Sequence, residues 1–122
     1  YPCAYSMTFN VTGNKLNAIL NQRSQDMLTA NNWNVAQYSV LLVMMAKVSG
    51  LVPGELVHVI ADAHVYDRHI PLCETLFDRP QYPAPKLVIK RDVKDFYDFR
   101  ADDFELEDYK YTPLGAKIEV AI

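Results

Sequence analysis

Apolar and polar side chains alternate near the start of the chain in a way that predicts a β-hairpin. Apolar residues recur at every second position from Leu16 to Leu20, and only Ile19 breaks the alternation. A Gly-Asn pair directly before this run marks a turn. The pattern therefore predicts a hairpin whose second strand spans 15–23 and whose first strand begins near Tyr5.

A mostly apolar segment over 33–49 predicts a helix. Asn31 and Asn32 offer a capping position ahead of this segment, and Gly50 and Pro53 end it. Because apolar residues would occur around nearly the whole circumference of this helix, we expect it to be buried on most sides.

The stretch over 55–66 predicts one long strand with two different faces, because the side chains of a strand point alternately to its two sides. One row is entirely apolar, which predicts packing contacts, and the other row carries histidine, aspartate and tyrosine. The apolar row consists of Val57, Val59, Ala61, Ala63 and Val65, and the mixed row consists of His58, Ile60, Asp62, His64 and Tyr66.

The rest of the chain predicts shorter elements. Residues 68–77 fit a short helix, the proline-rich run 79–85 must be irregular, and 87–89 fit a strand. Residues 91–110 hold twelve charged side chains interleaved with aromatic ones, which predicts a solvated segment anchored by its aromatic residues. Apolar residues alternate again over 117–122, which predicts a terminal strand or an extended docking segment. Strands with intervening helices but no regular βαβ alternation indicate an α+β fold, with helices packed on a mixed β-sheet.

Composition indicates a single folded domain over residues 1–122, with half of its residues hydrophobic and 22% charged. The net charge of −3 argues against nucleic acid as the main partner. The most apolar run, 40–46, is too short for a membrane span. Two cysteines without metal or disulfide spacing favour a reducing compartment, with the cytoplasm as the default. The sequence starts at Tyr1 without the pattern of a signal peptide, so we expect a further segment upstream.

Cys3 and Cys73 are the candidate thiols. Free cysteine is most often a small buried hydrophobe, and this tendency favours a packing role for both residues. A guanidinium near Cys3 would instead favour the reactive thiolate, and Arg23 is the candidate cation.

A polar run over 22–26 combines amide, guanidinium, hydroxyl and carboxylate groups where a strand is expected to end. Arg23 and Ser24 could clasp a phosphate, because the planar guanidinium matches phosphate oxygens. From spacing alone, a solvated strand end is the more common explanation, and Asp26 has a surface cap as its alternative. Asn34 could donate and accept hydrogen bonds at a pyrimidine edge, although a capping role is favoured by the local sequence.

The histidines do not have the spacing of a zinc site, so we expect no metal. Recognition of a hydroxyl group by His64 and Tyr66 is the better interpretation of that polar row.

These motifs, in this order and spacing, resemble the thymidylate synthase family over essentially the whole chain, which corresponds to the C-terminal portion of the family's sequence. Several independent motifs in register make the resemblance specific. They are Pro2-Cys3, Gln22-Arg23-Ser24 with Asp26, Trp33-Asn34-Val35-Ala36 with Tyr38, Asp62-Ala63-His64-Val65-Tyr66, Pro83, Pro85-Lys86, Asp102-Asp103-Phe104-Glu105 and Val120-Ala121-Ile122.

The resemblance implies reductive methylation of dUMP to dTMP, with methylenetetrahydrofolate or a related reduced pterin as the donor of the one-carbon unit and the hydride. Cys3 would be the nucleophile that adds to C6 of dUMP. Arg23 and Ser24 would bind the phosphate. Gln25 and Asp26 would belong to the same binding run, with Asp26 also approaching the pterin.

Further residues receive roles from the same resemblance. Asn34 would read the uracil edge. His64 and Tyr66 would hold the ribose hydroxyl, with Val65 between them in the same substrate-binding run. The C-terminal residues Ala121 and Ile122 would close over the folate and exclude water.

The chain also departs from the family pattern. Ala4 stands where the family usually has histidine, and Trp33-Asn34 replaces the usual Phe-Asn pair, which indicates a divergent branch. The family's N-terminal part, with a glutamate for proton transfer, a folate-stacking tryptophan and further phosphate-binding arginines, has no counterpart here. We therefore expect this chain alone to be inactive, and we expect the full-length protein to be an isologous homodimer, as family members are.

Two alternatives stay open. A deoxynucleotide hydroxymethylase would use the same fold, but those enzymes tend to carry an acidic residue at the position of Asn34, because cytosine offers an amino donor where uracil offers a carbonyl. A non-catalytic nucleotide-binding or dimerisation module is the other alternative, and Ala4 and the missing upstream part of the family's sequence motivate it.

Overall fold

The predicted hairpin is present in the structure, a computed structural model that describes residues 2–119. Strands β1 (Ala4–Thr12) and β2 (Lys15–Gln22) pair antiparallel. Gly13, in the turn between them, has a φ of 62°, a left-handed conformation that glycine adopts without strain. The prediction is confirmed, with the second strand ending one residue earlier than expected.

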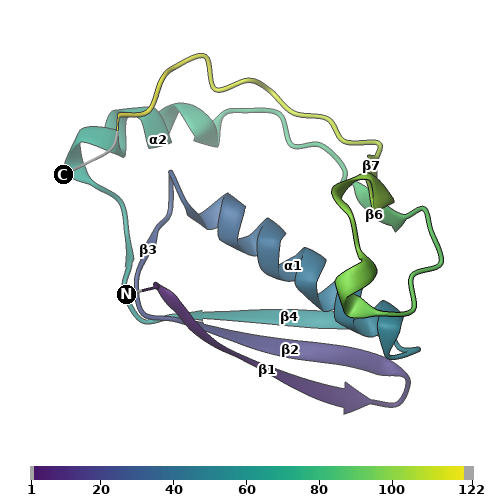
Figure 1. The fold of residues 1–122 in the computed structure, drawn as a ribbon. Coiled ribbons are helices and arrows are strands. Elements are labelled where there is room, and N and C mark those ends of the chain that lie inside the picture. Colours follow the sequence, from purple (N-terminus) through teal and green to yellow (C-terminus); the bar gives the residue numbers. More distant parts are fainter. Residues whose placement is uncertain (1, 120–122) are drawn as a thin grey trace.

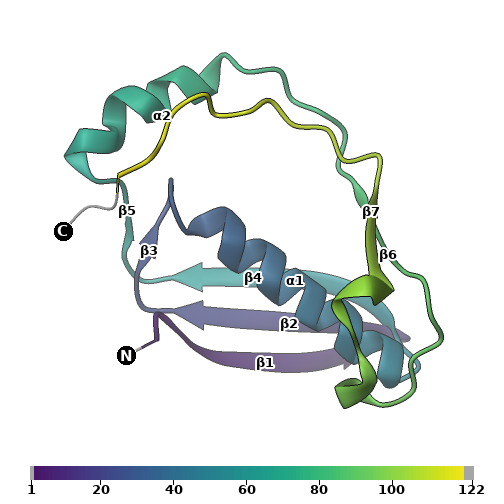
Figure 2. The same cartoon turned by 45° about the horizontal axis from the view of Figure 1, so that its top comes forward.

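A third strand, β4 (Val52–Ile60), pairs with β2 in parallel and gives a sheet of order β1-β2-β4. Helix α1 (Asn31–Val48) connects β2 to β4 and lies across one face of the sheet (Figure 1 and Figure 2). One antiparallel and one parallel pairing make this sheet mixed. The predicted α+β class, with helices on a mixed sheet, is confirmed.

The core lies between β2 and α1. Leu16 and Ala18 of β2 pack with Leu42 and Ala46 of α1, and each of the four is at most 6% exposed. The two alanines leave room for the helix backbone to approach the sheet, while each buried leucine contributes about 1.5–3 kcal/mol. Partly buried residues around this centre are Met7, Phe9, Met45, Leu51 and Leu56.

Two expectations for α1 are wrong within the described residues. The helix is not buried on most sides, because Leu42 and Ala46 are its buried residues and Trp33 is 78% exposed. No asparagine caps it either. Its N-cap is Ala30, and no side chain there accepts a capping hydrogen bond. A turn over 27–30 comes first, and it places Asn31 inside the first helical turn.

The long strand expected over 55–66 is divided in two. β4 ends at Ile60, and after a break at 61–62 the chain continues as β5 (Ala63–His64). β5 pairs in parallel with β3 (Gln25–Asp26) instead of extending the main sheet. The single-strand prediction is wrong because the alternation of side chains runs through the break without a turn residue to mark it.

The assignment of the two faces of this segment is also wrong. Val57 and Val59, expected to pack, are 49% and 47% exposed. Leu56, His58 and Ile60 are half-buried, and Leu56 packs against the core. The helix covers the mixed row, so the purely apolar row lies on the open face of the sheet.

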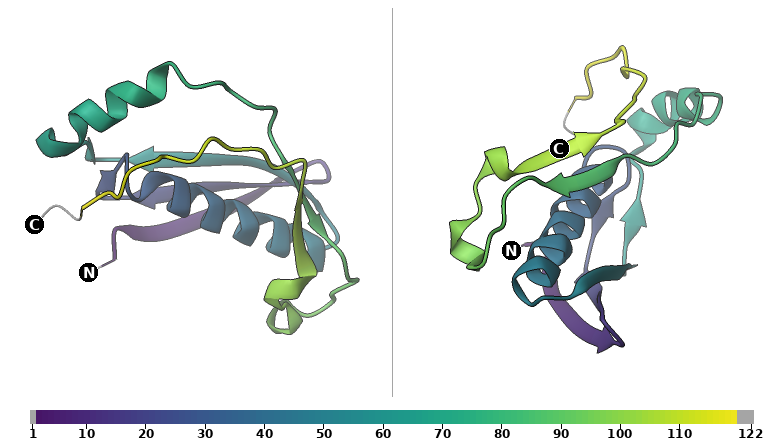
Figure 3. Two further views of the ribbon diagram at one scale, coloured as in Figure 1. Left: turned by 90° about the horizontal axis from the view of Figure 1, so that it is seen from above. Right: turned by 90° about the vertical axis from the view of Figure 1, so that its right-hand side faces the viewer.

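The second half of the chain confirms the expected short elements. A separate two-stranded antiparallel ribbon, β6 with β7, lies beside the C-terminal half of α1 (Figure 1 and Figure 3). The elements are η1 (Asp67–His69), α2 (Ile70–Phe77), β6 (Lys86–Ile89), η2 (Phe96–Asp98), η3 (Ala101–Asp103) and β7 (Phe104–Glu107). The run 79–85 has no helix or strand, as predicted, and 117–119 form no strand. Val120 and Ile122, the rest of the predicted terminal element, lie outside the described residues.

The aromatic residues of 91–110 anchor this segment only in part. Phe96, Phe99 and Phe104 are half-buried and form a chain of ring contacts, whereas Tyr97 is 92% exposed. None of the described helices combines the length and the apolar character that a membrane crossing requires.

An ion pair between Arg91, which follows β6, and Asp103, which precedes β7, joins the two strands of the ribbon at one end. Arg91 donates through Nε and NH2 to the two carboxylate oxygens of Asp103, both at 2.8 Å. The backbone N–H of Arg100 donates to the same carboxylate at 2.8 Å. The hydrogen bond from Arg91 has the largest effect, and that from Arg100 adds to it. Together they lower the pKa of the Asp103 carboxyl from its ordinary value of 3.8 to about 2.

The pKa of Asp103 predicts an acid-sensitive contribution to stability. The contribution is fully present above the unfolded pKa of 3.8 and is lost as the pH falls through about 2, because the unfolded chain binds the proton first. We expect Asp103→Asn to lower the free energy of unfolding at neutral pH and to flatten its pH dependence in this window, measured by urea unfolding at several pH values. Asp98→Asn, at an exposed carboxylate nearby, is the control. Equal acid dependence in Asp103→Asn and the unchanged chain would contradict the assignment.

Candidate functional site

The polar residues singled out from the sequence converge at one edge of the sheet. β2 and β4 are parallel, so their C-terminal ends lie at the same edge, and antiparallel β1 begins there (Figure 2). Just beyond this edge, the N–H of Gln25 donates to the carbonyl of Asp62, and that of Met27 donates to His64, both at 2.9 Å. The β3–β5 pairing thereby brings the run 22–26 beside 62–66.

Cys3 and Arg23 are neighbours at this edge. The N–H of Arg23 donates to the carbonyl of Cys3 at 2.9 Å, and its Nε donates to the carbonyl of Pro2 at 3.4 Å. Cys3 is exposed, so the burial favoured by its local sequence is wrong. The cause is its position at the end of an outer strand, outside the core beneath α1. The half-buried Cys73 fits its expected packing role more closely.

Asp62 connects the two halves of the polar cluster. Its Oδ2 accepts a hydrogen bond from the hydroxyl of Ser24 at 3.4 Å and lies 3.3 Å from Nδ1 of His64. The rings of His64 and Tyr66 meet edge to face with centroids 5.3 Å apart. Val65 and Tyr66 are 38% and 41% exposed, so the end of this run faces outward. Asp62 therefore orients Ser24 and His64, a role that its place in the polar row did not reveal.

A buried amide network lies beneath the cluster. Gln22 is 2% exposed, and its Nε2 donates to the carbonyl of Ser24 at 2.8 Å and to Oδ1 of Asn34 at 3.3 Å. Because a carbonyl only accepts, the contact with Ser24 fixes which end of the Gln22 amide is the nitrogen. Nε2 of His58 then donates to Oε1 of Gln22 at 2.9 Å. Oε1 of Gln25, which is 1% exposed, is a third acceptor at Nε2 of Gln22, so the two hydrogens of this amide are shared among three contacts.

This network sets the orientation of Asn34. With Oδ1 bonded to Gln22, the Nδ2 amide group is the end of Asn34 that has no acceptor among the described residues. Neither Gln22 nor His58 was identified as part of the site from the sequence. The position of Gln22 at the start of the polar run was the available signal, but its burial depends on the distant residues that cover it.

Asp26 closes the turn that leads into α1. Its Oδ1 accepts from the N–H groups of Leu28 at 2.9 Å and Thr29 at 3.1 Å, and its Oδ2 accepts from the Thr29 hydroxyl at 2.5 Å. Burial acts to raise the pKa of the Asp26 carboxyl, but the hydrogen bonds from Thr29 and Leu28 outweigh it and leave the pKa below its ordinary value. Asp26 therefore holds the turn over 27–30 and does not cap α1, and it is half-buried, so the alternative interpretation as a surface cap fits only in part. Its approach to a pterin stays a prediction.

The histidines are engaged with protein groups, and residues 2–119 contain no cluster of three or more side chains suited to a metal ion. His58 contacts Gln22, His64 contacts Asp62, and Nε2 of His69 lies 3.0 Å from the carbonyl of Glu119. The predicted folate-contacting residues Ala121 and Ile122 lie outside the described residues.

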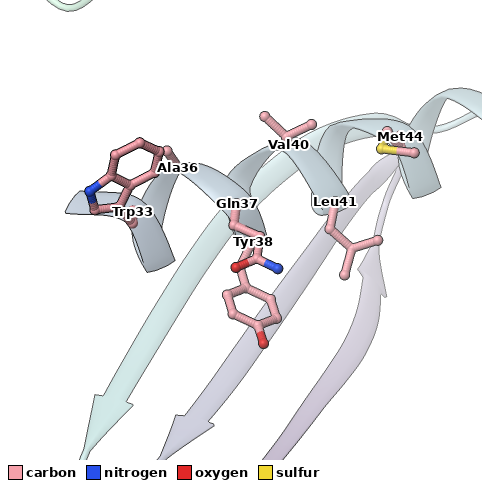
Figure 4. A pocket seen from close by; sticks show the side chains of 7 residues that line it. All are labelled: Trp33, Ala36, Gln37, Tyr38, Val40, Leu41 and Met44. Atoms are coloured by element: carbon pink, nitrogen blue, oxygen red, sulfur yellow. The ribbon is translucent and has the colours of Figure 1, made fainter. Parts of the chain in front are cut away.

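A separate apolar groove runs along the exposed side of α1 (Figure 4). It has a volume of about 480 Å³, and none of the predicted ligand-binding residues line it. Its lining residues are Trp33, Ala36, Gln37, Tyr38, Val40, Leu41 and Met44. The groove and the polar cluster are therefore distinct surfaces.

Comparison with known proteins finds one family. A family model described as thymidylate synthase matches residues 1–122. The thymidylate synthase of Bacillus licheniformis and thymidylate synthase 1 of Bacillus subtilis strain 168 are each 46% identical over 123 residues, which cover 99% of this chain. The solved structure of thermostable thymidylate synthase A from Bacillus subtilis superimposes with a TM-score of 0.89 over 99% of this chain, at 43% identity.

The matched region is only part of each relative. This chain spans 43% of the two Bacillus sequences and 42% of the solved chain. Residues outside this span therefore contribute the larger part of each relative.

Proposed function

The chain belongs to the thymidylate synthase family, and from this premise we propose that it supplies the cysteine and the nucleotide-binding residues of an enzyme that methylates dUMP to dTMP. The observation that carries the proposal is the convergence of Cys3, Arg23, Ser24 and His64 at one edge of the sheet. Methylenetetrahydrofolate or a related reduced pterin supplies the one-carbon unit and the hydride in this reaction.

Arg23 and Ser24 bind the phosphate of dUMP in this proposal. A guanidinium provides paired N–H donors for phosphate oxygens, and a hydroxyl adds a neutral donor. The Ser24 hydroxyl has one hydrogen, which it donates to Asp62 at 3.4 Å without a ligand, so it must turn from this long contact to the phosphate on binding, while Asp62 stays beside His64. His64 and Tyr66 then lie where they can hold the ribose hydroxyl, with Val65 between them.

Asn34 selects uracil. The relay from His58 through Gln22 turns Oδ1 of Asn34 toward Gln22 and leaves its amide N–H groups to donate to a ligand. Uracil presents a carbonyl acceptor at C4, whereas cytosine presents an amino donor there, so this orientation favours dUMP. This orientation supports the methyltransferase over a deoxycytidylate hydroxymethylase.

Cys3 acts as the nucleophile. Its thiolate sulfur bonds to C6 of the uracil ring, and the electron pair of the C5–C6 double bond moves toward C5 and the C4 carbonyl. C5 becomes the carbon that attacks the one-carbon unit. Exposure of Cys3 at the sheet edge, beside Arg23, supports this role over a packing role. Because both thiols of the chain are free, a reducing compartment such as the cytoplasm is part of the proposal.

The folate-binding part of the proposal rests on Asp26, Ala121 and Ile122. Three hydrogen bonds fix the Asp26 carboxylate, so it can contact the pterin without any rearrangement of the turn. We propose that the chain alone is inactive, because it spans less than half of its relatives.

Dihydrofolate release measures the activity directly. We expect the full-length protein to release dihydrofolate in the presence of dUMP and methylenetetrahydrofolate, and we expect Cys3→Ser to reduce the rate by at least ~10³-fold, since it removes the thiolate. Cys73→Ser, at the other free thiol, is the matched control and should retain most of the rate. Normal turnover in Cys3→Ser would overturn the proposal.

Nucleotide titration tests the binding half without turnover. Backbone amide shifts of the 122-residue chain should move on addition of dUMP at Arg23, Ser24 and His64, with weaker changes for dCMP. Asn34→Asp should reverse the preference, because a carboxylate accepts from the cytosine amino group. If dUMP moves none of these signals, the proposed site is absent from the isolated chain. Equal responses to both nucleotides would count against the role of Asn34.

The open face of the sheet supports homodimer formation. Apolar side chains from two of the three strands lie there at 45% exposure or more, namely Ile19 of β2 and Val57 and Val59 of β4. A face of this kind on an isolated protomer marks an interaction surface, and a self-complementary contact would be isologous.

Sedimentation equilibrium tests the dimer. We expect the full-length protein to sediment as a dimer and Val57→Glu to shift it toward the monomer, because the charge would be buried in the contact. Glu74→Gln, at an exposed position of α2 away from this face, is the control. A full-length protein that is monomeric before any substitution would refute the assembly.

A further inference from the structure

The C-terminal strap, residues 109–119, returns from β7 along α2 toward the edge that carries the polar cluster (Figure 1 and Figure 2). It has no helix or strand of its own, so side chains from elsewhere must hold it. Arg79 and Tyr82 do so near its middle, and His69 does so near its end.

Arg79 is the first anchor. Its NH1 donates to the carbonyls of Thr112 at 3.2 Å and Pro113 at 3.0 Å, and its NH2 donates to that of Leu114 at 2.9 Å. The hydroxyl of Tyr82 adds an exposed contact with Thr112 at 3.2 Å. Three consecutive carbonyls are thus tied to one guanidinium, which fixes the strap at 112–114.

His69 is the second anchor, and it is buried. It is 4% exposed, and its Nε2 lies 3.0 Å from the carbonyl of Glu119. A carbonyl only accepts, so Nε2 carries the hydrogen and donates it. Nδ1 is buried without a partner among the described residues, and in this tautomer it carries only a lone pair. Among the described residues, this buried ring therefore makes its one hydrogen bond to the end of the strap.

Gly115 lies between the two anchors. Its φ is 73°, in the left-handed region where other residues are strained. Nothing lies within 4 Å of the position that a Cβ would take there. The chain therefore turns at Gly115 because of its backbone conformation and not because of crowding. In residues 116–119, Ile118 is half-buried and the carbonyl of Glu119 is held by His69.

The ring of His69 is also connected to the polar cluster. The backbone N–H of His69 donates to the carbonyl of Tyr66 at 2.8 Å, and the two rings meet edge to face at 6.0 Å. Tyr66 in turn packs on His64. One buried side chain thus contacts both the nucleotide-binding run and the strap.

We propose that His69 is a positioning residue that latches the end of the C-terminal strap against the nucleotide-binding run. It touches neither nucleotide nor folate. Its role is to hold residues 116–119 beside the nucleotide-binding run, and any effect of this on folate binding rests on the proposed function. Arg79 holds residues 112–114 of the strap independently of the hydrogen bond between His69 and Glu119.

Backbone relaxation of the 122-residue chain tests the latch without any ligand. We expect order parameters of residues 116–119 to fall from about 0.85 to below about 0.6 in His69→Phe, which keeps an aromatic ring but lacks the donor. Residues 112–114 should stay ordered. His69→Gln restores an Nε2 donor at a similar reach and should keep 116–119 ordered.

Two controls separate the latch from a general loss of structure. Tyr82→Phe removes an exposed contact near the other anchor and should leave 116–119 unchanged. Amide shifts of β1, β2 and β4 should be unchanged in every variant that folds. Unchanged order at 116–119 in His69→Phe, or equal loosening in His69→Gln, would overturn the latch.

Ligand binding to the full-length protein tests the consequence. In protein saturated with dUMP, we expect His69→Phe to weaken tetrahydrofolate binding by about 3- to 10-fold, the loss of one hydrogen bond, with His69→Gln within about 2-fold. The affinity for dUMP itself should not change. If the unchanged protein binds neither ligand, the proposed function fails while the relaxation experiment still decides the latch. Equal weakening of dUMP and tetrahydrofolate would show a general structural role and refute positioning.

Discussion

The parallel pairing of β2 with β4 is the constraint on which the rest of the structure depends. It requires a crossover connection, which α1 provides, and α1 covers one face of the sheet with Leu42 and Ala46. It also brings the C-terminal ends of both strands to one edge, where the start of antiparallel β1 already lies. Polar side chains that follow each strand, Ser24 after β2 and Asp62 after β4, therefore meet although 38 positions separate them. The short β3–β5 pairing continues the same register beyond the sheet and fixes the cluster.

The local sequence pattern predicted most of the helices and strands, but it predicted less well which of their side chains are buried and what those side chains contact. The period-two run from Leu16 to Leu20 and the apolar segment after Trp33 correctly indicated β2 and α1, because hydrogen bonding within each element follows from nearby residues. The break after Ile60 left no trace in the alternation, since both sides of it are extended. The open apolar row with Val57 was misassigned because periodicity gives the two faces of a strand but not which of them a helix will cover. That choice depends on the crossover, a non-local feature.

The candidate site shows the same division. The polar run 22–26 and the row with His64 were visible as chemistry at strand ends, and the resemblance to the thymidylate synthase family gave them roles. Local reasoning favoured burial for Cys3, and the structure exposes it, because burial depends on which strands become the outer ones. Gln22 and Asp62 were not recognised as orienting groups. Each acts through partners far away in the sequence, His58 and Asn34 for Gln22, and Ser24 for Asp62, and no local signal predicts such pairs.

The buried polar groups explain why this small core can hold a well-defined site. Within residues 2–119 they are Gln22, Gln25, His69 and Asp103. A buried polar group without a partner costs about 1–3 kcal/mol, so each restricts its surroundings to arrangements that provide one. Gln22 thereby fixes the amide of Asn34, and Asp103 fixes Arg91 and the β6–β7 ribbon. His69 differs because its described partner is a carbonyl of the strap, which has no secondary structure to hold it. Of these four groups, His69 is therefore the one whose hydrogen bond can break without disrupting a strand or a helix. Movement beside the rigid nucleotide-binding edge is thus expected at the end of the strap.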